Sequence, residues 1–325
     1  MKRRPSKLAP LALLAAAATV LSLSGCANRA GGTAGGEDFP AQSITFYTPT
    51  QAGGATDLTA RTLATQLEAE LGQSIVVDNR PGGAGSVGMT HVAGLAADGY
   101  SIMVFPVEVS MLGHQGYDID PANYDFLGIV NEQPGTIAVP ADSPYETLED
   151  LIAAAKANPG SVTISNAGPG SIWEAGATEL GNVAGVEVQG VPFDGGAPAV
   201  TAAVGGQVDA VVAGIGETAP ANEDGRLRVL AVFTEERAPA LPDVPTAGEA
   251  GYDVVIGSWA AIGAPAGLDP AVKESLQAAI ETAAGSSEYI ELIESGGNIP
   301  VFIPGDEATD FVTAEHERFA ELFGE

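Results

Sequence analysis

The sequence predicts an α/β protein made of two lobes, each a parallel sheet covered by helices. Three observations predict this class. Short runs of β-branched residues alternate with Ala- and Leu-rich helical patterns along the chain, which is typical of strand-helix-strand units. A β-α-β-α-β order in the first third is followed by a second set of strands and helices. After the N-terminal segment about 290 residues remain, enough for two α/β domains around separate cores.

The first unit is predicted as three strands that alternate with two helices. The strands cover residues 43–47, 74–77 and 100–105, and the helices cover 57–71 and 89–97. In the first helix, Leu63, Leu67 and Leu71 recur every four residues and therefore form one apolar stripe. Gly72 ends that helix, because glycine readily adopts the left-handed conformation that closes a helix.

The second unit begins near residue 137, and the chain then returns to the first. Its predicted strands are 137–139, 162–165, 187–191, 208–212 and 228–233, and its helices are 148–157 and 171–183. Two further helices start at Asp269, an N-cap followed by proline, and near Glu307. The predicted domains are lobe 1 at 39–135 plus 233–325 and lobe 2 at 136–232, with hinges near 133–137 and 232–234.

The N-terminal segment has the pattern of a secretory signal that ends at the only cysteine. Four basic residues open it, residues 8–20 are rich in Leu and Ala, and residues 23–26 read LSGC. We predict a signal peptide at 1–25, lipidation at Cys26 and a glycine-rich tether at 26–38. A transmembrane anchor is the alternative, but the apolar stretch is short and contains Pro10.

The charge of the chain excludes one class of partner. The sequence has 13 Lys and Arg against 42 Asp and Glu. Four of the basic residues lie in the signal, so nine remain afterwards and the net charge becomes −33. A nucleic-acid partner is incompatible with this charge. With Cys26 lipidated, no internal disulfide is possible.

Two loops at the carboxyl ends of predicted strands lead directly into helices. The first covers residues 48–57 and contains Gly53 and Gly54, and the second covers 166–171. Free N–H groups at a helix start attract a small anion. An ordinary strand-to-helix turn, with Thr56 or Asp57 as N-cap, is an equally good interpretation of the first loop alone. Two such helix starts in two lobes can face one another across a cleft.

Two further loops follow strands and contain acids. Residues 192–198 include Asp194 and Gly195, and residues 214–217 end in Glu217. Both acids are able to accept hydrogen bonds from a ligand hydroxyl or ammonium group. On composition alone, solvated loop acids are the simpler interpretation of each.

Residues 83–88 match G-x-G-x-x-G, so a dinucleotide site has to be weighed. The loop follows the second strand of its unit and not the first, and no acidic residue ends a strand about 20 positions later. We therefore predict a packing turn and no dinucleotide cofactor.

The sequence contains no recognisable catalytic or metal-binding constellation. It lacks a G-x-S-x-G motif, and His91, His114 and His316 do not have metal-ligand spacing. His316 is expected to be a solvated surface residue, and His91 to pack on its helix. We expect no enzyme activity, no metal and no cofactor, because no nucleophile, base and orienting residue can be named.

Several spaced motifs carry a family resemblance over nearly the whole chain after residue 40. They are GGATD at 53–57, VDNRPGGAG at 77–85, ADGY at 97–100, VPF at 191–193, GGQVD at 205–209, GRLRVLAV at 225–232, LPDVPT at 241–246, SW at 258–259 and APAG at 264–267. In these the chain resembles the solute-binding receptors of tripartite tricarboxylate transporters, the Bug or TctC-like family.

The resemblance implies a periplasmic-binding-protein type II fold, two Rossmann-like lobes with the ligand cleft between them. It implies that backbone N–H groups of the two helix-start loops hold a ligand carboxylate. The ligand-binding candidates are Gln51, Gly53, Gly54, Ala55, Thr56, Asp57, Asn166, Gly170, Ser171, Asp194, Gly195 and Glu217. The family often has His where Glu174 stands and Lys or Gly where Asp194 stands. These two extra acids favour a ligand that also carries an amine or several hydroxyls.

The resemblance also implies the function. We expect a lipid-anchored, extracytoplasmic, monomeric receptor that captures a small di- or tricarboxylate or related organic acid. Its partners would be the ligand, the membrane permease subunits of the transporter, and the membrane that holds the anchor. A ligand sensor for a membrane kinase is the first alternative, and a surface enzyme is the second.

Overall fold

A computed structural model describes residues 39–53 and 55–323. The predicted signal peptide, Cys26 with its tether, and the candidate Gly54 lie outside the described residues. Within the described part, no helix has the length and apolar character needed to cross a membrane.

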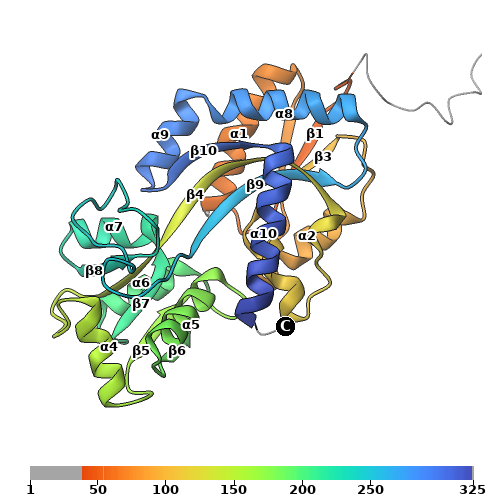
Figure 1. Cartoon of the computed structure of the whole chain (residues 1–325). Coiled ribbons are helices and arrows are strands. Elements are labelled where there is room, and N and C mark those ends of the chain that lie inside the picture. Colours follow the sequence, from red (N-terminus) through yellow and green to blue (C-terminus); the bar gives the residue numbers. More distant parts are fainter. Residues whose placement is uncertain (1–38, 54, 324–325) are drawn as a thin grey trace, which may run out of the picture. The chain divides into compact units, whose positions relative to one another are not determined.

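Two long antiparallel strands organise the sheet (Figure 1). Strand β4 (Tyr124–Pro140) pairs with β9 (Gly257–Pro265). The strand order is β2-β1-β3-β9-β4-β7-β5-β6, and β8 (Leu227–Val232) and β10 (Ile299–Pro304) also pair with β4. The first part of β4 belongs to one half of the sheet and the part after Pro134 to the other. We call the halves lobe 1 and lobe 2.

Lobe 1 combines a parallel β1-β2-β3 unit with β9, β10 and the first part of β4. Strand β1 (Ile44–Thr48) lies between β2 (Ile75–Asn79) and β3 (Ser101–Pro106). Its helices are α1 (Ala55–Leu71), α2 (Ser86–Ala93), α3 (Glu108–Met111), α8 (Pro270–Ala284), α9 (Ser287–Ser295) and α10 (Gly305–Phe323). Asp269 caps α8, since its side chain accepts the Ala271 N–H, as the Asp-Pro pattern predicts.

Lobe 2 consists of β5 (Thr163–Asn166), β6 (Gln189–Pro192), β7 (Ala210–Gly214), β8 and the end of β4. Its helices are α4 (Leu148–Ala157), α5 (Ile172–Ala184), α6 (Gly196–Val204) and α7 (Ile215–Glu223). Strands β5, β6 and β7 are parallel, whereas β7 and β8 run antiparallel to β4. The parallel strands bring the loops after β5 and β7 to one edge of the sheet.

Three apolar clusters stabilise the described part. One lies under α1, α8 and α9 and contains the predicted leucines Leu63 and Leu67, both fully buried. Another lies under α6 and α7. The largest continues from lobe 1 into lobe 2 through residues such as Trp173, Phe233 and Trp259. The lobes therefore share apolar packing, which the prediction of separate cores did not anticipate.

The predicted α/β class is confirmed, but the sheets are mixed and not purely parallel. The middle strands β4 and β9 are antiparallel to their neighbours. Strand β4 is 17 residues long, whereas the sequence prediction covered only residues 137–139 of it. A long strand buried on both faces has no alternating pattern to mark its ends. The residue boundaries of the two lobes stay a prediction.

The expectation for His316 is wrong. Its ring stacks on His114 with centroids 4.1 Å apart, and its Nδ1 lies 2.9 Å from the Ser110 carbonyl oxygen. Two glutamates flank His316 in the sequence, but the residue is half-buried because α10 packs against α3. His91 packs against the Tyr47 ring at 5.3 Å.

Candidate functional site

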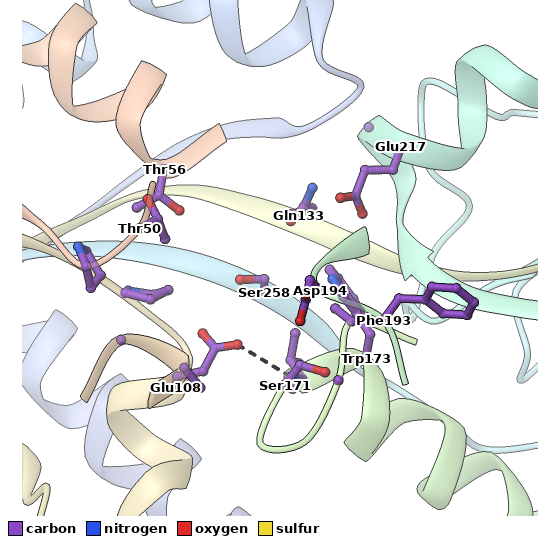
Figure 2. A pocket seen from close by; sticks show the side chains of 18 of the residues that line it. Thr50, Thr56, Glu108, Gln133, Ser171, Trp173, Phe193, Asp194, Glu217 and Ser258 are labelled. Atoms are coloured by element: carbon purple, nitrogen blue, oxygen red, sulfur yellow. Dashed lines mark hydrogen bonds between the residues drawn. The ribbon is translucent and has the colours of Figure 1, made fainter. Parts of the chain in front are cut away.

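A cavity of about 550 Å³ opens between the two lobes at the carboxyl ends of their parallel strands (Figure 2). Lobe 1 contributes Pro49, Thr50, Thr56, Ala84, Gly85, Pro106, Glu108, Gln133, Ser258, Gly296 and Asn298. Lobe 2 contributes Ala167, Gly168, Pro169, Ser171, Ile172, Trp173, Phe193, Asp194, Gly216 and Glu217. Both anion-ready loops predicted from the sequence therefore reach the same cavity.

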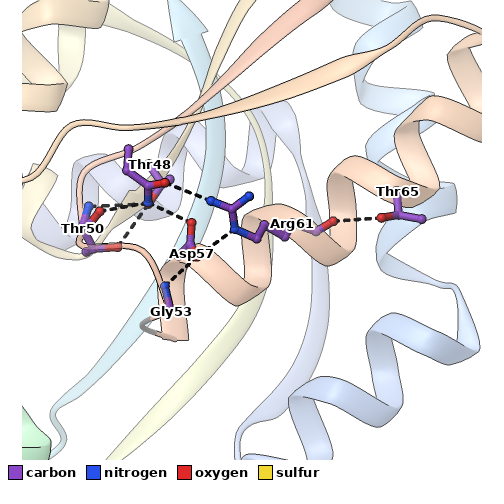
Figure 3. Close-up of polar contacts among 7 residues, drawn as sticks. Thr48, Thr50, Gly53, Asp57, Arg61 and Thr65 are labelled. Atoms are coloured by element: carbon purple, nitrogen blue, oxygen red, sulfur yellow. Dashed lines mark hydrogen bonds and ion pairs between the residues drawn. The ribbon is translucent and has the colours of Figure 1, made fainter.

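A hydrogen-bond network around Asp57 shapes the loop that precedes α1 (Figure 3). Asp57 Oδ2 accepts the Gly53 N–H at 2.7 Å and Arg61 Nε at 2.9 Å, while Oδ1 accepts Asn79 Nδ2 at 2.8 Å. Burial alone would raise the pKa of Asp57, but the hydrogen bonds from Arg61, Gly53 and Asn79 together lower it. Asp57 is 1% exposed, so it fixes the loop that presents Thr56 to the cavity.

The start of α5 is capped within the chain. Ser171 is the N-cap, and its Oγ accepts the Glu174 N–H at 3.2 Å. Glu174 Oε2 in turn accepts the Gly170 N–H at 2.9 Å. One contact crosses between the lobes: Glu108 Oε1 accepts the Ile172 N–H at 3.4 Å. A carboxyl group of lobe 1 therefore lies at the helix start of lobe 2, where a ligand carboxylate was expected.

Glu217 of lobe 2 occupies a similar position at another helix start. It lies in the first turn of α7, and its Oε2 accepts the Gly214 N–H at 3.1 Å. Its carboxyl group also lies over the first residue of α6, since a Cβ on Gly196 would collide with both of its oxygens. Figure 2 shows the carboxyl groups of Glu108 and Glu217 pointing into the cavity from different elements.

The cavity is rich in hydrogen-bond acceptors. Its charged lining residues in the described part of the chain are Glu108, Asp194 and Glu217, with no Lys, Arg or His among them. Burial raises the pKa of Glu108 to about 7, despite the backbone hydrogen bonds that lower it, and burial also raises the pKa of Glu217. Asn298 Oδ1 is buried and has no hydrogen-bond partner among the described residues.

Four of the predicted site residues line the cavity: Thr56, Ser171, Asp194 and Glu217. The other described candidates are not among its lining residues: Gln51, Gly53, Ala55, Asp57, Asn166, Gly170 and Gly195. Several of these build the loops. Asn166 Oδ1 accepts the Gly168 N–H at 2.9 Å, and Gly195 is the N-cap of α6.

The sequence prediction missed cavity residues that the fold brings in. Glu108, Gln133, Ser258 and Asn298 were absent from the predicted site. Only Glu108 had a usable signal, because it follows the third strand of a parallel unit, at the same sheet edge as the first loop. Gln133 and Ser258 lie within the long antiparallel strands β4 and β9, and Asn298 lies in the loop after α9.

The glycine-rich segment 83–88 forms a short helical turn followed by the start of α2. Ala84 and Gly85 line the cavity, so this turn also contributes part of the wall. No group of three or more metal-ligating side chains occurs in the described part of the chain.

A mixed α/β chain with a ligand-sized cavity between two halves of its sheet has the architecture of the two-lobed solute-binding proteins. Residues 59–325 match the family described as the tripartite tricarboxylate transporter family receptor, TctC. The chain belongs to this family, as its motifs predict. The matched family is one of receptors.

Known relatives support this membership. Protein BugT of Bordetella pertussis is 32% identical over 296 residues, which cover 87% of this chain and 89% of BugT. MatC from Rhodopseudomonas palustris with bound malate is 27% identical and has a TM-score of 0.78, covering 88% of this chain and 100% of MatC. An R. palustris protein with adipate is 28% identical, with a TM-score of 0.79 and coverages of 88% and 99%. The predicted type II fold is thereby confirmed.

Proposed function

We propose that this protein captures a small organic acid in the interlobe cavity and delivers it to a tripartite tricarboxylate-type transporter outside the cytoplasm. The observation that carries the proposal is the cavity of about 550 Å³ with the first turn of α1 at its wall. The first N–H groups of a helix have no carbonyl partner within the helix and attract a carboxylate. The malate and adipate bound by the two relatives support this ligand class.

Binding between the lobes also supports a closure mechanism. A ligand that contacts both lobes stabilises the arrangement in which they are close, and a permease can recognise that arrangement. The two lobes are joined where Phe233 N–H donates to the Gly135 carbonyl at 2.8 Å and Ile256 N–H to that of Phe233 at 3.0 Å. These residues lie in or beside the predicted hinges.

A calorimetric screen tests the proposed function. Mono-, di- and tricarboxylates, and acids that also carry an amine or hydroxyl, are titrated into the purified protein. We expect saturable binding of at least one of them with one site per chain. Absence of binding by every carboxylate would refute the proposal.

We further propose that Cys26 carries the lipid that keeps this receptor at the membrane, on the strength of the LSGC pattern at residues 23–26. A Cys26→Ser variant should leave the membrane fraction and bind the same ligand with unchanged affinity. Retention of that variant in the membrane fraction would contradict the lipid anchor.

A further inference from the structure

We infer that the ligand is an aliphatic aminocarboxylate, a zwitterion whose carboxylate meets the start of α1 and whose ammonium group faces Glu108, Asp194 and Glu217. The inference rests on the proposed function, because it names the ligand class of the same cavity. It assigns a direction to the ligand: carboxylate toward the start of α1, ammonium toward Glu108 of lobe 1 and Asp194 and Glu217 of lobe 2, which we together call the acidic wall.

The helix starts near the acidic wall already hold carboxyl groups of the chain itself. Glu108 accepts the Ile172 N–H at the start of α5 at 3.4 Å. Glu217 accepts the Gly214 N–H at the start of α7 and lies over Gly196 at the start of α6. A ligand carboxylate at these places would lie beside a carboxyl group, which is unfavourable unless one of the two takes up a proton.

The start of α1 differs, because its acidic residue is turned away from the cavity. Asp57 is buried, and its two oxygens accept hydrogen bonds from Gly53, Arg61 and Asn79. Thr56, its neighbour in the first turn, lines the cavity. Of the two helix-start loops predicted to hold a ligand carboxylate, those before α1 and α5, the first is therefore the one without a carboxyl group of the chain in the way.

The acidic wall requires a donor. Besides the three acids, Asn298 Oδ1 is a buried acceptor that lacks a partner among the described residues and lines the same cavity. A buried acceptor without a donor costs free energy, so a ligand that supplies one is favoured. An ammonium group supplies three donors and a positive charge, which the lining side chains of the described part lack.

The protonation of Glu108 gives the affinities for an aminocarboxylate and for a dicarboxylate opposite dependences on pH. The pKa of Glu108 is raised to about 7 by burial, so at about pH 8 the wall is more negative than at about pH 5.5. An aminocarboxylate then binds more tightly at the higher pH. A dicarboxylate, which needs protonated acids beside its second carboxylate, binds more tightly at the lower pH.

The experiment is calorimetry on the purified protein with matched probes at both pH values. The aminocarboxylates are glycine, β-alanine, 4-aminobutanoate and 6-aminohexanoate, and the matched acids are succinate, adipate and hexanoate. We expect at least one aminocarboxylate to bind about tenfold or more tightly than the dicarboxylate of similar length at pH 8. If succinate or adipate binds as tightly or more tightly, the inference is overturned while the proposed function stands. If no probe binds, the inference is overturned, and the wider carboxylate screen decides the proposed function.

Two conservative variants locate the ammonium group. Glu108→Gln and Glu217→Gln keep an acceptor oxygen, and each should weaken aminocarboxylate binding about tenfold without weakening adipate binding. Glu223→Gln is the matched control, since it removes one negative charge from an exposed residue of the same helix, α7, and should change neither. Equal affinities of all three variants for the aminocarboxylate, with folding verified by circular dichroism, would overturn the inference.

Discussion

At the scale of single residues, Asp57 illustrates the difference between a residue that shapes a site and a residue that binds the ligand. The family resemblance predicts that its backbone N–H group contacts a ligand carboxylate. In the structure both oxygens of its side chain accept hydrogen bonds, from the loop and from Asn79 and Arg61. Arg61 also donates to Asn79 Oδ1 at 3.0 Å, which closes the network. Asp57 therefore acts on the site by fixing the loop before α1.

We predict that Asp57→Ala lowers the free energy of unfolding by about 2 to 3 kcal/mol, because it removes a buried carboxylate that accepts three hydrogen bonds. The pKa of Asp57 is lowered in the folded protein, so its stabilisation is present above its ordinary pKa of about 3.9 and is lost as the pH falls below that value. Urea unfolding between about pH 3 and pH 7 measures both effects. Glu70→Gln, an exposed change on the same helix, is the control. A stability loss equal to that of the control would contradict the structural role.

At the scale of elements, the helix starts around the cavity are not equivalent. Those of α5 and α6 lie against Glu108 and Glu217, whereas α1 presents its first turn through Thr56. The same local motif, a loop that leads into a helix after a strand, thus has two outcomes in one chain. Side chains from other elements decide whether a helix start is covered by a carboxyl group or faces the cavity.

We predict that Thr56→Pro abolishes carboxylate binding, with affinity reduced at least about tenfold, while the protein remains folded. Proline is tolerated in the first turn of a helix but removes the N–H group that would contact the ligand. Glu149→Pro places the same change at the second residue of α4, outside the cavity, and should leave affinity unaltered. Calorimetry measures the carboxylate affinity of both variants. Tight binding by Thr56→Pro would exclude α1 from the site.

At the scale of the whole described part, the lobes meet on the far side of the cavity from Glu108. Gly216 of α7 approaches Gly296, the C-cap of α9, so closely that a Cβ on Gly216 would collide with the Gly296 carbonyl oxygen. Both glycines line the cavity. Close approach of the lobes at this point therefore depends on the absence of a side chain.

We predict that Gly216→Ala weakens ligand binding about tenfold, because overpacking costs about 1 to 3 kcal/mol and opposes the close arrangement of the lobes. The stability of the fold should change little, since the lobes can move apart. Gly248→Ala is the control, because a Cβ there would meet only Thr246 Oγ1 at 3.6 Å. Calorimetry measures affinity, and small-angle scattering measures lobe separation. Unchanged affinity in Gly216→Ala would show that closure does not use this contact.

Local patterns in the sequence were sufficient for much of the fold. Helix α4 was predicted at 148–157, the residues it occupies, and the structure shows a capping box at Thr147 that fixes its start. Strand β9 was missed as a strand, and β4 was predicted only in part, because strands buried on both faces lack alternation. The family motifs supplied the type II architecture that periodicity alone does not define.

By itself, the sequence determined the α/β class, the family and four of the residues at the cavity wall, because each depends on local order or on spaced motifs. Only the tertiary structure decided the polarity of the cavity. Glu108 and Glu217 lie 109 positions apart in the sequence, and Asn298 lies further along, yet all three line one cavity. Their proximity results from long antiparallel strands that join the lobes, and sequence spacing does not encode a distance across a sheet. The acidic lining of the cavity is therefore a property of the folded chain.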